Sequence, residues 1–386
     1  MEQKELLFSL FKAELRDETV LLPKEEVTPD DLLTLYQIAK DHDLAHMLGA
    51  ALSRTDLLEM TPEIGEKLTK GQMLALYRYE RLNFEYSRIC ALFEKEQIPY
   101  VPLKGAVLRQ YYPKPYMRTS CDIDVLIKEE DIERALLVLT EQLSYKADGG
   151  KTFHDVHVYS PGGVHLELHY NIKEDIEPMD RVLLQVFDHL EKAEGSEYRY
   201  LQTPEYLYFH QIAHAAYHFI KGGCGIRPVM DLYLLKKHLP YEKERLEALL
   251  EKAELQTFAR ALFLLSEVWF GEEQHTPLTL EMESYILGAG VYGTVENSVA
   301  MGRAVKKGKV SYILGHVFMP YGKLKGRFPI LEKHPLLFPF VSVYRWLRIL
   351  FGKHHDLAIS VFKTNAALSE DKKDRLAALR NNLKLK

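Results

Sequence analysis

The stretch Cys121-Asp122-Ile123-Asp124-Val125-Leu126-Ile127 repeats with a period of two, which predicts a β-strand. Successive side chains of a strand point to opposite faces of its sheet, so Asp122 and Asp124 share one face and Ile123 points the other way. Aspartate is depleted in strands, and two of them inside an apolar strand indicate a function for that face. A solvated face near a sheet edge is the plainer alternative.

A second strand with the same pattern follows. Pro161-Gly162-Gly163 separates two strand-like stretches, 152–159 and 164–170, and predicts a hairpin. In the later stretch Glu167 lies opposite to its leucine neighbours. Paired carboxylates repel unless a cation lies between them, and Mg²⁺ is bound by one or two carboxylates together with substrate phosphates. Taken alone, Glu167 is more simply a polar residue on a strand face. Beside the two aspartates we favour a metal-binding role.

Upstream, Leu103-Lys104-Gly105-Ala106-Val107 predicts a strand that enters a glycine turn and then a helical turn. Such a turn leaves backbone N–H groups and a helix dipole pointing at an anion, which suits a phosphate. Lys104 would add a positive charge. Arg118 is a second phosphate-binding candidate, although a surface arginine in a loop is the common case.

Elsewhere apolar residues recur at spacings of three and four, which predicts helices on both sides of this small unit. We therefore expect an α+β fold, with a small mixed β-sheet core embedded in a mostly helical chain. The expected regions are an N-terminal helical region (1–97), an α/β core (98–172), a helical region packing on the core (173–300) and a basic helical C-terminal region (301–386).

Composition limits the class of protein. The chain has 386 residues, of which 47% are hydrophobic and 27% charged, as in an ordinary protein with a packed core rather than a disordered one. Three widely spaced cysteines form no disulfide set, and the acid-containing start, 1–18, does not resemble a signal peptide, so we expect a cytoplasmic protein. No apolar run is long enough for a transmembrane segment.

The charge is unevenly distributed. Residues 301–386 contain 18 Lys and Arg against 5 Asp and Glu, whereas the other residues carry a net charge of −18. This asymmetry indicates either an anionic partner or neutralisation of one part of the chain by the other. Within the basic part, the amphipathic stretch 336–351 could lie on an anionic membrane surface, but we favour a helix docked on the body.

Three histidines, His210, His214 and His218, recur every fourth residue on the helix expected over 206–219. This spacing brings two of them near enough to bind a metal, but a packed stripe is the commoner outcome. Contact with a nucleotide or an acceptor ranks above metal binding.

Several of these motifs together resemble a divergent, mostly uncharacterised bacterial nucleotidyltransferase family of the polymerase-beta-like superfamily. The resemblance is carried by Leu103-Lys104-Gly105, Tyr112-Pro113, Arg118, Asp122 to Ile127, and Leu166-Glu167-Leu168-His169. It extends from about residue 30 to 350, and includes Arg227, Asp231-Leu232-Tyr233-Leu234-Leu235 and Pro335-Leu336-Leu337.

The resemblance implies transfer of a nucleoside monophosphate from an NTP such as ATP to an acceptor, with Mg²⁺ or Mn²⁺ and release of pyrophosphate. The acceptor stays open between a small molecule, a protein and RNA, and no stable nucleic-acid complex is expected. Implied catalytic and metal-binding residues are Asp122, Asp124 and Glu167; implied nucleotide-binding residues are Lys104, Gly105, Ala106 and Arg118; implied nucleotide or acceptor contacts are His165, His169, His214 and Arg227.

The turn departs from the superfamily pattern. Its usual Gly-Gly or Gly-Ser is Gly105-Ala106 here. Without a serine hydroxyl, phosphate binding is left to backbone N–H groups, Lys104 and Arg118. This departure keeps open the alternative of a catalytically inactive nucleotide-binding or partner-binding protein with the same fold.

Overall fold

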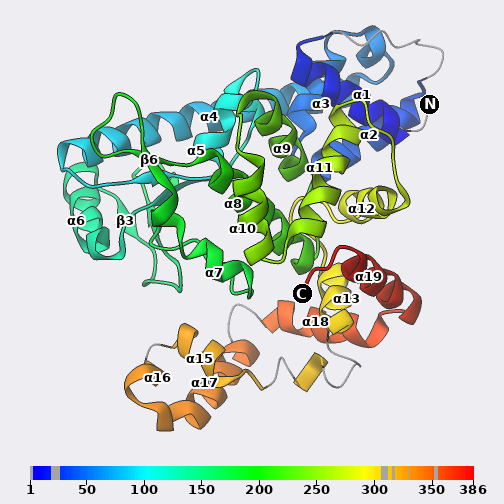
Figure 1. The fold of residues 1–386 in the computed structure, drawn as a ribbon. Coiled ribbons are helices and arrows are strands. Elements are labelled where there is room, and N and C mark those ends of the chain that lie inside the picture. The colour runs from blue at the N-terminus through cyan, green and yellow to red at the C-terminus, as the bar shows by residue number, and fades with distance from the viewer. Residues whose placement is uncertain (1–2, 19–26, 306–311, 315–317, 329, 352–354) are drawn as a thin grey trace.

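The computed structural model describes residues 3–18, 27–305, 312–314, 318–328, 330–351 and 355–386. Helices dominate this part of the chain and surround a five-stranded sheet and a two-stranded ribbon (Figure 1), which confirms the expected α+β fold. The N-terminal helices are α1 (Gln3–Arg16), α2 (Pro29–Asp41), α3 (Ala45–Leu52) and the long α4 (Pro62–Lys95).

The five-stranded sheet has the order β1-β2-β5-β4-β3. Its strands are β1 (Val101–Pro102), β2 (Asp122–Leu126), β3 (Lys146–Ala147), β4 (Asp155–Tyr159) and β5 (His165–His169). The expected hairpin is present, because β4 and β5 pair antiparallel on either side of Pro161-Gly162-Gly163. β2 and β5 pair parallel and lie at the centre, so the sheet is mixed.

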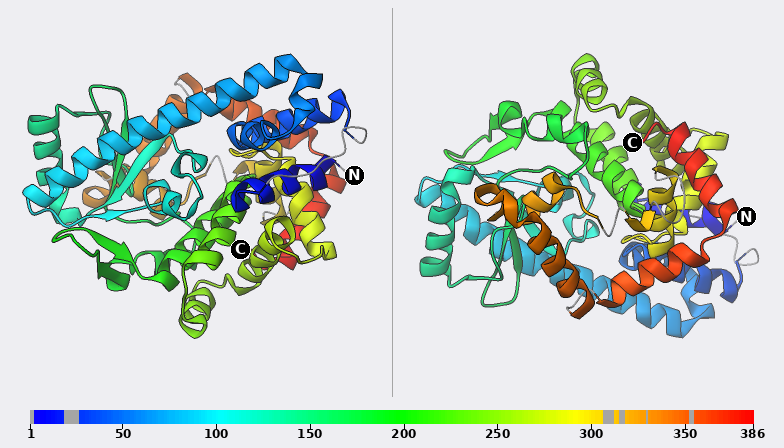
Figure 2. Two further views of the ribbon diagram at one scale, coloured as in Figure 1. Left: turned by 90° about the horizontal axis from the view of Figure 1, so that it is seen from above. Right: turned by 90° about the horizontal axis from the view of Figure 1, so that it is seen from below.

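Two helices cover the apolar face of this sheet. Ile123 of β2 and Leu166 of β5 are buried against α4 and α6 (Ile132–Leu143), in a core separate from that of the helical body. Figure 2 shows α4 running the length of the molecule along this side. The burial of these alternate residues fixes the register of both strands, since a slip by one residue would expose the whole apolar set.

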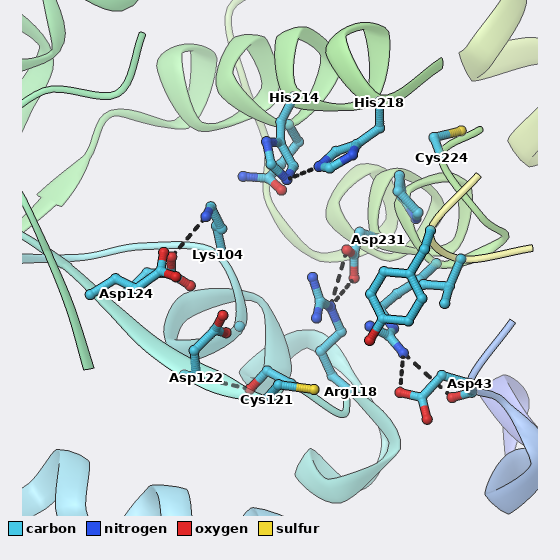
Figure 3. A pocket seen from close by; sticks show the side chains of 18 residues that line it. Asp43, Lys104, Arg118, Cys121, Asp122, Asp124, His214, His218, Cys224 and Asp231 are labelled. Atoms are coloured by element: carbon cyan, nitrogen blue, oxygen red, sulfur yellow. Dashed lines mark hydrogen bonds and ion pairs between the residues drawn. The ribbon is translucent and has the colours of Figure 1, made fainter. Parts of the chain in front are cut away.

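The polar face of the sheet looks toward the helical body. One helix of this body, α7 (Met179–Leu183), precedes the ribbon β6 (Leu190–Lys192) and β7 (Tyr200–Gln202) in the chain. The others follow the ribbon and are α8 (Pro204–Lys221), α9 (Arg227–His238), α10 (Lys243–Lys252), α11 (Gln256–Phe270) and α12 (Pro277–Leu287). α8 and α9 lie side by side across from β2, while α5 (Gly105–Leu108) follows the glycine turn (Figures 1 and 3).

The C-terminal elements form two groups. α13 (Val295–Val305), α18 (His355–Ala367) and α19 (Glu370–Asn382) pack together, with α13 also contacting α8. α15 (Tyr321–Arg327), α16 (Ile330–Lys333) and α17 (Phe338–Phe351) form a second group that stands apart from the body in Figure 1. Within the described parts of the chain, no helix combines the length and apolarity needed to cross a bilayer.

Candidate active site

The parallel pairing of β2 with β5 brings the acidic residues of both strands together. Asp124 is the register partner of Glu167, and Asp122 is the partner of His165. Adjacent strands are about 4.8 Å apart, so side chains of partner residues on one face are neighbours. One oxygen each of Asp124 and Glu167 and one nitrogen of His169 lie within 4.8 Å of one another. These three atoms form a group that could hold a metal ion.

Asp124 is the most constrained of these carboxylates. Its side chain is 3% exposed, and its Oδ1 accepts hydrogen bonds from Lys104 Nζ at 2.7 Å and from His169 Nε2 at 3.0 Å. Burial alone would raise the pKa of Asp124, but the charge of Lys104 and the hydrogen bond from His169 outweigh it and hold that pKa well below its usual range. Asp124 is therefore ionised at any physiological pH.

The pKa of Asp122 shifts in the opposite direction to that of Asp124. Burial, together with the charges of Asp124 and Glu167, raises the pKa of Asp122 to about 6. Burial also acts on Glu167, but a hydrogen bond from His169 lowers the net pKa of that carboxyl. The cluster thus carries more negative charge than Lys104 and His169 neutralise, which is the condition that a divalent cation relieves.

The glycine turn positions Lys104 against this cluster. Lys104 has φ 44° and ψ −118°, a positive-φ conformation that is strained for a residue with a side chain. The turn closes by a hydrogen bond from the Ala106 N–H to the Leu103 carbonyl at 3.1 Å. A Cβ on Gly105 would lie 3.1 Å from Ser120, so glycine fits this close approach. The strained backbone at Lys104 points its ammonium at Asp124.

Two of the predicted residues, Ala106 and His165, lie away from the main cavity, and a third, His169, lies beneath the carboxylates without lining it. The N–H of Ala106 is already hydrogen-bonded within the turn, to the Leu103 carbonyl. The residue lines a different pocket, with Tyr79 and Arg109. His165 stacks on Tyr159 with ring centroids 4.7 Å apart, further along the same sheet face. Neither residue is among those lining the cavity beside Asp122.

That cavity has a volume of about 320 Å³ and lies between the sheet and the helical body. Of the predicted residues it is lined by Lys104, Gly105, Arg118, Asp122, Asp124, Glu167, His214 and Arg227. Figure 3 shows Asp122 and Asp124 on one side and His214 and His218 of α8 opposite. His169 lies beneath, buried against the carboxylates that it orients.

The arginines of the cavity wall are held by acids that are remote in sequence. Arg118 Nε donates to Asp231 at 2.8 Å, and Tyr112 donates its hydroxyl to the same carboxylate at 2.6 Å. Arg227 Nη2 donates to Asp43 at 2.8 Å. Both guanidinium groups are thus fixed in the wall with partners of opposite charge.

The histidine pair of α8 has a largely buried acid behind it. His214 Nδ1 lies 2.7 Å from Glu174 Oε1, and His214 Nε2 lies 3.2 Å from His218 Nε2. Burial lowers the pKa of both histidines to about 3 and raises the pKa of Glu174. Both imidazoles are therefore neutral near pH 7. Glu174 follows β5 by only five residues and faces the histidine stripe. No sequence pattern had marked it as a functional residue.

His210 of the same stripe does not join this pair. Its Nδ1 lies 3.1 Å from the side-chain amide of Gln202, and the residue is buried. Neither His210 nor His214 with His218 forms a group of three metal-ligating side chains among the described residues.

A carboxylate cluster on two strands, next to a turn lysine and a cavity with two arginines in its wall, is consistent with a metal site. A family model described as an uncharacterised nucleotidyltransferase matches residues 28–271. The match spans more than half of the chain and includes the sheet and α8. The chain belongs to this nucleotidyltransferase family, as its motifs indicated.

The matched range begins close to the expected residue 30 but ends well before 350. The segment Pro335-Leu336-Leu337 therefore lies outside it. Every cavity residue except Val291 and Tyr292 lies inside it. No curated protein matches the chain.

Proposed function

We propose that this protein is a nucleotidyltransferase that moves a nucleoside monophosphate from an NTP to an acceptor and releases pyrophosphate. The observation that carries the proposal is the parallel register of β2 and β5. It aligns Asp124 with Glu167, two residues from Asp122, on the wall of a cavity that also holds Lys104.

The residues fit a divalent cation. Asp124, Glu167 and His169 place ligand atoms within 4.8 Å of one another, and Asp122 adds a third carboxylate on the same strand face. The pKa of Asp122 is raised by burial and then by the charges of Asp124 and Glu167, and carboxylate oxygens are the ligands that Mg²⁺ and Mn²⁺ prefer. When bound, the metal would neutralise the triphosphate and align an attacking oxygen with the α-phosphorus.

Lys104 serves as the counter-ion of the carboxylate cluster and as a triphosphate ligand. Its ammonium is held by Asp124 and also feels the charges of Glu167 and Asp122, which raise its pKa. With a cation bound at those carboxylates, Lys104 would be free to donate to phosphate oxygens. Arg118 adds positive charge on the neighbouring wall, where its ion pair with Asp231 holds it in place.

The acceptor enters on the α8 side of the cavity. Glu174 accepts the Nδ1 proton of His214, so the lone pair of His214 lies on Nε2. An acceptor hydroxyl can replace His218 as the donor to that nitrogen. The acceptor oxygen then bonds to the α-phosphorus, the bond to the pyrophosphate oxygen breaks, and His214 takes the hydroxyl proton. Glu167 is the alternative base on the opposite wall.

The test uses each labelled NTP in turn, with Mg²⁺ or Mn²⁺ and a cell lysate as the source of acceptors. We expect pyrophosphate release and transfer of label to one acceptor. Asp124→Asn should abolish both, whereas Glu133→Gln, an exposed change on the far side of the sheet, should not. Binding of NTP without pyrophosphate release across a broad acceptor panel would instead support an inactive nucleotide-binding protein. Full activity of Asp124→Asn would overturn the assignment.

A further inference from the structure

α17 and the turn that leads into it present an apolar face to solvent. Leu336 is 90% exposed, Phe340 72% and Phe351 85%. Val343 and Leu347 lie between them and are exposed as well. The spacing of these five residues is three or four, so they form one continuous stripe along the helix. Soluble proteins rarely leave such a stripe uncovered, and an exposed apolar patch of this kind marks an interaction surface.

No described element covers this stripe. α17 packs through its other side, where the ring of Phe338 lies 5.7 Å from that of Tyr321 and the ring of Tyr344 lies 6.1 Å from that of Phe328. Among the described elements, α17 makes its main contacts with α15, α18 and the short turn Pro335–Leu337. The sequence-based preference for a helix docked on the body is therefore wrong for the outer side of α17.

The chemistry around the stripe identifies its occupant. Residues 321–351 contain six Lys and Arg against one acid, Glu332, whose carboxylate lies 3.3 Å from Lys325. Arg345 and Arg348 belong to α17 itself, and each has its guanidinium over an aromatic ring of the same helix. A second copy of this chain would bring the same excess of positive charge against itself. An anionic surface that also accepts apolar side chains satisfies both features.

We propose that α17 binds the surface of an anionic phospholipid bilayer. The helix has 14 residues, too few to span the roughly 30 Å hydrocarbon core, so it lies in the plane of the interface. Its apolar stripe enters the acyl region, and its two arginines meet the phosphate headgroups. This inference does not depend on the proposed transferase activity.

The experiment is flotation of the full-length protein with phosphatidylcholine vesicles, prepared with and without phosphatidylglycerol. We expect binding only to the anionic vesicles, with an affinity that falls as salt is added. The double change Phe340→Glu with Leu347→Glu should weaken partitioning at least about tenfold. Phe84→Glu, which adds a charge at an exposed aromatic residue of α4, is the matched control and should bind as the unchanged protein does.

A second variant guards against misfolding of the first. Arg345→Gln with Arg348→Gln keeps the apolar stripe and should weaken binding to anionic vesicles about tenfold or more, with a shallower salt dependence. Absence of vesicle binding, or binding that neither double variant changes, would overturn the proposal. Light scattering that detects a dimer lost in Phe340→Glu with Leu347→Glu, without vesicle binding, would overturn it in favour of a second copy.

Discussion

Lys104 Nζ lies 2.7 Å from Asp124 Oδ1, so the lysine of the glycine turn and the central carboxylate of β2 form an internal ion pair. The same oxygen accepts a hydrogen bond from His169. The site therefore carries its own counter-ion, and binding of a cation has to displace part of this arrangement. Under the proposed function, the pair would link metal binding to the availability of Lys104 for the NTP.

Replacing Lys104 with methionine tests this link. The change leaves Asp124 buried without its cation, and the expected cost is about 3 kcal/mol of unfolding free energy. The value of kcat/KM for the NTP should fall at least about a hundredfold, because Lys104 is the nearest cation for the triphosphate. Thermal unfolding and steady-state kinetics measure the two effects.

Adding Mg²⁺ separates the two contributions in that variant. Mg²⁺ should restore part of the lost stability of Lys104→Met, because it compensates the same carboxylates, whereas kcat/KM, which is measured with Mg²⁺ present, should stay low. Equal stability of the variant and the unchanged protein without metal would contradict the internal counter-ion.

The two aspartates of β2 are expected to affect stability in opposite directions. The folded pKa of Asp122 is raised to about 6 from an ordinary 3.8, so ionising it penalises the fold. The penalty is absent below pH 3.8, grows between pH 3.8 and 6, and levels off above pH 6 at roughly 3 kcal/mol. Asp122→Asn should therefore be more stable than the unchanged protein at pH 7, and indistinguishable from it near pH 4.

Asp124→Asn should behave in the reverse sense. The folded pKa of Asp124 is lowered, so its contribution to stability is present above pH 3.8 and is lost as pH falls. Removing the charge also takes from the half-buried Lys104 its contacting carboxylate and leaves only the charges of Glu167 and Asp122 near it, which costs about 1–3 kcal/mol. Both asparagine variants should lose transfer at least about a hundredfold. Denaturant titrations across pH distinguish them, and a common direction of change would contradict the charge distribution.

Local patterns were sufficient to predict the acidic sheet. The period of two in β2 and β5 follows from burial of Ile123 and Leu166 on one face. Pro161-Gly162-Gly163 specifies the hairpin of β4 and β5. The sequence could not show that β5 rather than β4 lies next to β2, because that choice depends on packing over the whole core. The prediction of Glu167 beside Asp124 was conditional on this neighbourhood, which the structure has.

Local sequence patterns could not predict contacts between residues that are remote in sequence. Arg118 meets Asp231 across 113 positions, and Arg227 meets Asp43 across 184. Glu174 follows β5 in an irregular segment, so no periodicity marks it, and only the fold brings it behind His214. Local sequence also does not reveal that the Ala106 N–H closes the turn.

Glu174→Gln tests the acceptor side. The amide can keep a contact with His214, but it lacks the charge that stabilises the imidazole once it has taken a proton. We expect turnover with acceptor to fall about ten- to a hundredfold, with no change in NTP affinity. The pKa of His214 is lowered to about 3, so this residue should contribute no ionisation to the rate profile between pH 5 and 8.

The control for Glu174→Gln is Glu197→Gln, the same change at a surface residue, because the ion pair of Glu197 with Lys192 is solvent-exposed. That change should leave turnover and NTP affinity as they are. A loss of NTP affinity in Glu174→Gln, with turnover at saturation unchanged, would assign this acid to the nucleotide rather than to the acceptor.

The Arg118–Asp231 pair is expected to contribute to the free energy of unfolding. Both side chains are largely buried, and Tyr112 donates to the same carboxylate. Asp231→Ala leaves a buried guanidinium and a buried hydroxyl without their acceptor, and should cost about 3–5 kcal/mol. Asp231→Asn keeps an oxygen acceptor and should cost less. Glu242→Gln, which breaks the exposed pair with Arg245, should cost under about 0.5 kcal/mol. Chemical denaturation orders the three variants, and because Arg118 lines the cavity, the alanine variant should also raise the KM for the NTP.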